Sequence, residues 1–98
     1  MNEFNDVNNP IHYNGNGFVQ AKDAIDSMLY NQPSWMSGST VYWWGCAFKY
    51  LWRWPFKGRI EDIDKAIWCL ETLKNHATAD LMLVAKNKWE EEMIEDDQ

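Results

Sequence analysis

The feature that most constrains the fold is a run of aromatic and aliphatic residues over positions 40–54. Five of the seven tryptophans of this 98-residue chain lie in or close to the run, and apolar residues fall on nearly every side of a helix drawn through it. A helix of this kind needs neighbours on several sides. The run therefore predicts a buried central helix that follows Ser39 as its N-cap and ends before Pro55 and Gly58. A strand over residues 41–44 is the alternative, because β-branched and aromatic residues favour strands.

Apolar residues at helical spacing predict further helices on both sides of this run. One helix is expected over residues 19–30, a second over residues 60–75, and a third over residues 79–94 with Thr78 as its cap. The break at His76 is weak, so a single long helix over the last two segments is the alternative. We therefore predict a mainly α protein, built as a small bundle of three to four helices.

The length of the chain suits a single domain over residues 1–98. Residues 1–16 are rich in Asn and Gly and contain a proline, which predicts an irregular N-terminal loop segment. Residues 17–77 are expected to form the helical core. Residues 78–98 are expected to form a C-terminal helix with an acidic tail, because six of the last nine residues are acidic.

Charge is unevenly distributed, and this bears on partners and location. The net charge of −6 argues against a protein that coats extended nucleic acid, although residues 27–60 contain four basic residues and no acidic one. The most apolar stretch is short and carries two charges, so no membrane span is expected. The opening residues lack the basic and apolar segments of a signal peptide, and the two cysteines are too few for a secreted disulfide framework. We therefore expect a cytoplasmic protein.

Basic residues interleaved with aromatic ones form the strongest candidate site. Lys49 and Arg53 are four residues apart and project from one helix face, which Cys46 continues, and Lys57 follows in the turn. Arginine offers a bidentate fork to phosphate and lysine a point charge, while Trp52 offers a ring on which a base can stack. The alternative is that these basic residues solubilise the helix and pair with acidic residues of the next helix.

Two further features have chemical potential. His12 and Tyr13 lie in the N-terminal loop, where a histidine can act as a general acid or base or bind phosphate; the alternative is a ring packed on the fold. Glu61, Asp62 and Asp64 offer carboxylates suited to Mg²⁺, and the alternative is a favourable interaction with the helix N-terminus. The histidines and cysteines lack the spacing of a zinc site, so no resident metal is expected.

Three stretches of the chain carry a family resemblance. They are Val-Asn-x-Pro-x-His-Tyr at residues 7–13, a segment like Gly-x-x-Glu-x-Ile-Asp-x-Ile at residues 17–25, and Lys-Tyr-x-x-Arg at residues 49–53, followed by Lys-Gly at 57–58, Glu-Asp-Ile at 61–63 and Lys-Ala at 65–66. In this order they resemble a family of small tailed-phage proteins of unknown function. Gln20 and Cys46 depart from the family pattern, which has Glu and Asn there.

The resemblance implies a nucleotide-related function. Members are often labelled nucleotide kinases, by similarity to an atypical, oligomeric coliphage enzyme that phosphorylates deoxynucleoside monophosphates without a Walker loop. A kinase of this kind would act in the cytoplasm of the infected bacterium and use ATP and Mg²⁺. The catalytic groups we predict are His12, Lys49 and Arg53. The ligand-binding groups we predict are Tyr13, Trp52, Lys57, Asp62 and Lys65.

Two alternatives need no catalysis. The chain could sequester a signalling nucleotide of host defence, or it could bind and inhibit a host protein through its tryptophans, with the acidic tail mimicking nucleic acid. The five tryptophans between Trp35 and Trp54 also exceed what one small core easily encloses, which favours a surface for a ligand or for a second copy. A homo-oligomer is therefore expected.

Overall fold

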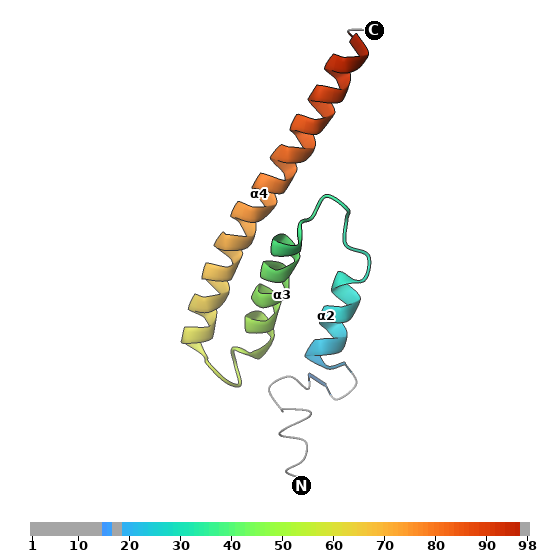
Figure 1. Ribbon diagram of the computed structural model, residues 1–98. Coiled ribbons are helices and arrows are strands. Elements are labelled where there is room, and N and C mark those ends of the chain that lie inside the picture. Colours follow the sequence, from blue (N-terminus) through green and yellow to red (C-terminus); the bar gives the residue numbers. More distant parts are fainter. Residues whose placement is uncertain (1–14, 17–18, 97–98) are drawn as a thin grey trace.

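Three helices make up the described part of the chain, which is residues 15–16 and 19–96 of the computed structural model. They are α2 (Ala21–Leu29), α3 (Gly38–Arg53) and α4 (Ile60–Asp96). Helix α3 lies in the middle, packed mainly against the antiparallel α4 and more sparsely against α2 (Figure 1). No strand occurs in the described segments. The predicted mainly α class is confirmed, and the strand alternative over residues 41–44 is excluded.

Helix α3 begins two residues earlier than predicted, because a distant carboxylate organises its start. The hydroxyl of Ser37 accepts a hydrogen bond from the backbone N–H of Thr40 at 3.3 Å, so Ser37 is the N-cap and the expected cap at Ser39 is wrong. Asp80 of α4 accepts hydrogen bonds from the Ser37 N–H at 2.8 Å and from the Thr40 hydroxyl at 2.5 Å. Thr40 is fully buried in this contact. The start of α3 therefore depends on α4.

Helix α4 is a single helix of 37 residues, which confirms the alternative of one long helix and overturns the predicted pair. Residues 60–96 contain neither Gly nor Pro, so nothing in the sequence forces a break. Thr78 does not cap a new helix; its hydroxyl donates instead to the Lys74 carbonyl at 2.7 Å, as in a helix interior. At 1.5 Å per residue, α4 is about 55 Å long. The described fold is correspondingly elongated, with extents of 71 × 25 × 17 Å.

Small residues fill the contact between α3 and α4. Ala47, Ala66 and Cys69 are each at most 2% exposed, so the two helices approach closely. The predicted burial of α3 is only partly correct, because among the described elements α3 packs on α2 and α4 and α2 is only nine residues long. Tyr42 is 62% exposed and Leu51 50% exposed. None of the described helices is long and apolar enough to cross a membrane.

Candidate functional site

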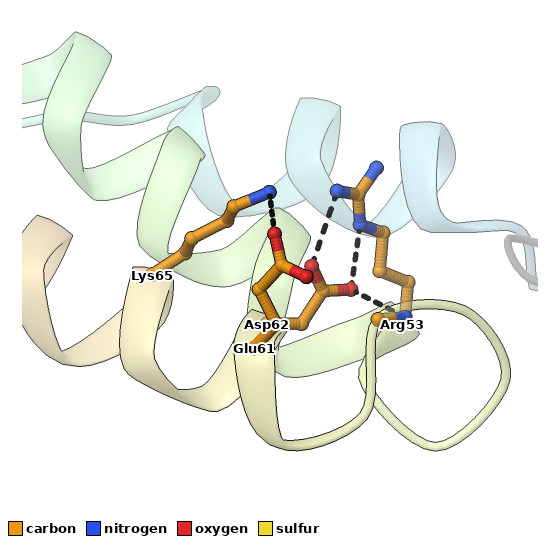
Figure 2. A network of polar contacts seen from close by, with 5 residues as sticks. Arg53, Glu61, Asp62 and Lys65 are labelled. Carbon is orange, nitrogen blue, oxygen red and sulfur yellow. Dashed lines mark hydrogen bonds and ion pairs between the residues drawn. The ribbon is translucent and has the colours of Figure 1, made fainter.

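An ion pair joins the end of α3 to the start of α4, on either side of the connecting turn (Figure 2). Arg53 donates from Nε to Asp62 Oδ2 at 3.0 Å and from Nη2 to Asp62 Oδ1 at 3.3 Å. The backbone N–H of Gly58 donates to the same carboxylate at 3.1 Å. The two side chains are only 11% and 2% exposed. The hydrogen bond from Arg53 is the main cause that lowers the pKa of Asp62. The basic cluster thus does pair with an acidic residue of the next helix.

The turn between α3 and α4 brings the backbone of Gly58 close to the Asp62 carboxylate. The N–H of Arg59 donates to the Trp54 carbonyl at 2.7 Å, and Arg59 has a positive φ of 50°. A Cβ added to Gly58 would lie 2.6 Å from Asp62 Oδ2 and closer still to the rest of the carboxylate. Only glycine therefore lets the chain pass close enough for its N–H to reach Asp62.

Beside this ion pair, a cavity of about 310 Å³ opens between α3 and α4. Its lining is aromatic and basic, with two thiols. The residues are Tyr42, Trp43, Cys46, Lys49, Tyr50, Lys65, Trp68 and Cys69. The cavity therefore combines rings that can stack on a flat ligand with cations that can bind an anion.

The cations of the cavity converge on the ring of Tyr50. Lys49 Nζ of α3 lies 4.8 Å from the ring centroid and Lys65 Nζ of α4 lies 5.8 Å from it, while Arg53 Cζ is 4.8 Å away. Cation–π attraction favours this gathering and offsets part of the repulsion between like charges. Lys65 also pairs with Glu61 at 3.3 Å, but Glu61 is 75% exposed, so that pair is weak (Figure 2).

Aromatic rings form the walls of the cavity in edge-to-face contact. The Trp43 ring lies 5.1 Å from the rings of both Tyr42 and Trp68, with interplanar angles of 81° and 83°. Such contacts are favourable and fix the ring orientations. Hydrogen bonding with the Cys46 thiol raises the pKa of Tyr42, and burial raises the pKa of Cys69. Both groups therefore remain neutral at neutral pH and add no negative charge to the site.

The structure brings some of the predicted site residues together and separates others. Lys49 and Lys65 share the cavity, and Arg53 and Asp62 pair beside it. The other predicted residues lie elsewhere or are not described. Trp52 packs on Phe48 and on Gly15, Lys57 is an exposed residue of the turn, and His12 and Tyr13 lie outside the described residues.

Sequence reasoning missed most of the aromatic half of this cavity. Tyr50 had a signal, since it stands in the Lys-Tyr-x-x-Arg motif, and Trp68 follows Lys65 at helical spacing i+3. No group of three or more metal-ligating side chains forms within residues 15–16 and 19–96.

Fold and site together define the class: a small all-α protein with a basic and aromatic cavity between two antiparallel helices. The chain belongs to the family described as "protein of unknown function (DUF3310)", whose model matches residues 7–71. The match includes every described residue that lines the cavity and ends within α4. No curated protein and no solved structure shows significant similarity to the chain.

Proposed function

We propose that this protein binds a nucleotide, or a closely related phosphorylated aromatic ligand, in the cavity between α3 and α4. The observation that carries the proposal is the convergence of Lys49 and Lys65, from two helices, on the Tyr50 ring at an aromatic cavity. Ammonium groups bind phosphate oxygens in charge-assisted contacts. Aromatic rings accept any base by stacking, so one cavity offers partners for both parts of a nucleotide.

The size and charge of the cavity favour a small ligand with a single phosphate group. A volume of about 310 Å³ is at the lower end of the ~300–1,000 Å³ usual for small-molecule sites. Two lysines provide two positive charges, which match one phosphate dianion better than a triphosphate. A nucleoside monophosphate is the ligand class that fits both properties.

Binding without catalysis is better supported than phosphoryl transfer. Transfer to a nucleoside monophosphate would need ATP, Mg²⁺ held by oxygen ligands, and cations for the transferred group. The lining that the described residues contribute contains no carboxylate, and the nearby Asp62 is held by Arg53. A phage protein of this kind would sequester a signalling nucleotide in the host cytoplasm. The kinase reading, which rests on the family resemblance and on His12, is the second candidate.

Titration of the purified protein with each deoxynucleoside monophosphate tests the proposal. We expect saturable binding that quenches tryptophan fluorescence, and about tenfold or greater weakening in Lys49→Ala and in Lys65→Ala, since each removes a charge-assisted contact worth ~1.5–3 kcal/mol. Lys86→Ala is the matched control, because Lys86 is 68% exposed and distant in sequence from the cavity. The proposal fails if no monophosphate binds, or if the control loses as much affinity as the cavity variants.

Mass spectrometry of the recovered nucleotides separates the two candidates. After incubation with ATP and Mg²⁺, unchanged monophosphates support sequestration. Diphosphates that disappear in Lys49→Ala would instead establish the kinase.

A further inference from the structure

The last part of α4 extends beyond its partner helix. Asp80 contacts the first turn of α3, and residues 81–96, here called the α4 arm, continue past that point into solvent (Figure 1). Every side chain from Leu81 to Ile94 is exposed. Most helices in proteins gain their stability by packing an apolar face against other elements. Among the described residues, the arm therefore lacks the packing that usually stabilises such a helix.

One face of the α4 arm carries an apolar stripe. Leu81, Ala85, Trp89 and Met93 follow one another at every fourth position, and Met82 lies beside them. The four large side chains among them are 45–67% exposed. The stripe does not continue the face that packs on α3, because Asp62, Ala66, Cys69 and Asp80 lie on a different side of the helix. It is a separate contact surface.

Charge on the α4 arm changes sign at the centre of this stripe. Lys86 and Lys88 precede Trp89, whereas residues 90–92 are all glutamate. Two parallel copies would place lysines against lysines and glutamates against glutamates. Two antiparallel copies that cross at Trp89 place each basic segment opposite the acidic segment of the other, which favours that orientation alone.

We propose that the α4 arm is a dimerisation element: two copies of this chain pair antiparallel through the apolar stripe, with Trp89 at the two-fold axis. The same surface serves both copies, as an isologous interface requires. Aromatic residues at the centre of an interface usually contribute most to affinity. The pairing is independent of any ligand in the cavity, since none of the cavity residues belongs to the arm.

Sedimentation velocity of the full chain tests the pairing. We expect a species of twice the 11.6 kDa chain mass that dissociates on dilution. Trp89→Glu should weaken the dimer at least tenfold, whereas Leu83→Glu, the same type of change outside the stripe and about 120° around the helix from Trp89, should alter it less than twofold. Circular dichroism checks that neither variant is globally unfolded. A monomer at every concentration, or equal effects of the two variants, overturns the proposal and leaves the stripe as a surface for a different protein.

An exchange of charges tests the orientation. A variant with Lys86→Glu, Lys88→Glu, Glu90→Lys and Glu92→Lys keeps complementary segments when it pairs with itself antiparallel, but not when it pairs with the wild type. We expect native mass spectrometry of a mixture to show two homodimers and little heterodimer. Preferential formation of the heterodimer would establish parallel pairing and overturn the antiparallel arrangement.

Discussion

Replacing Gly58 with alanine should strongly destabilise the protein, because the turn between α3 and α4 has no room for a methyl group. The added Cβ would lie 2.6 Å from Asp62 Oδ2, whereas ordinary contacts begin at 3.4 Å, so the carboxylate would have to move by at least 0.8 Å, the difference between the two distances. It cannot move without breaking the hydrogen bonds from Arg53 and from the Gly58 N–H. Gly58 does not have a positive φ, so the effect is purely steric.

The expected cost of Gly58→Ala is about 3 kcal/mol, the upper end of the ~1–3 kcal/mol range for overpacking. For a domain of this size that corresponds to a melting temperature lowered by roughly 12–24 °C. Urea denaturation followed by tryptophan fluorescence measures the free energy of unfolding. Gly45→Ala is a matched control with the opposite sign, since nothing lies within 4 Å of an added Cβ there and alanine favours the interior of α3. It should stabilise by ~0.5–1 kcal/mol.

A double-mutant comparison isolates the cause. In an Asp62→Ala background the methyl group at position 58 meets no carboxylate, so Gly58→Ala should cost much less there than in the wild type. The steric reasoning is refuted if the cost is the same in both backgrounds, or if Gly58→Ala alone leaves the midpoint of denaturation unchanged.

The remaining predictions concern pH and the start of α3. Folding lowers the pKa values of Asp62 and Asp80 below their ordinary 3.8, through hydrogen bonds from Arg53 and from the Ser37 N–H respectively, so their stabilisation is present above pH 3.8 and is lost as the pH falls through the lower folded values. Urea titrations at pH 6 and pH 3 should show the loss, and Asp80→Asn should reduce the difference between them. Ser37→Ala should cost about 1 kcal/mol of unfolding free energy by the same assay, whereas Ser39→Ala should change it little, because only Ser37 caps the helix.

The helical architecture was predictable because it depends on local signals. Apolar periodicity located α2 and the two halves of α4, the apolar run over residues 40–54 located α3, and the weak break at His76 left a continuous α4 open. The start of α3 was not predictable in the same way. Both Ser37 and Ser39 are good caps, and the choice between them depends on Asp80, more than forty residues away. The sequence around Ser37 therefore gives no information about that contact.

The candidate site was predictable only in part, because a charged residue near aromatics has the same sequence signature whether it binds a ligand or another part of the chain. Lys49 and Lys65 line the cavity, as sequence reasoning allowed, whereas Arg53 meets Asp62. Which basic residue finds an acidic partner depends on the turn geometry, and above all on the close approach at Gly58.

Two aspartates of α4 fix the contact between α3 and α4 at which the cavity opens. Asp62 and Asp80 are 18 residues apart, which is five full turns, so both face α3. Asp62 holds the last residue of α3 and Asp80 holds its first turn, so the two contacts fix the register of the helices at both ends. Small buried residues between them set a close separation, and the larger side chains at Lys49 and Lys65 are left to meet at the edge of the contact. Arg53 and Asp62 therefore act as positioning residues. The sequence suggested that Arg53 binds phosphate, but in the structure its guanidinium pairs with Asp62 and helps to align Lys49 and Lys65, which line the cavity.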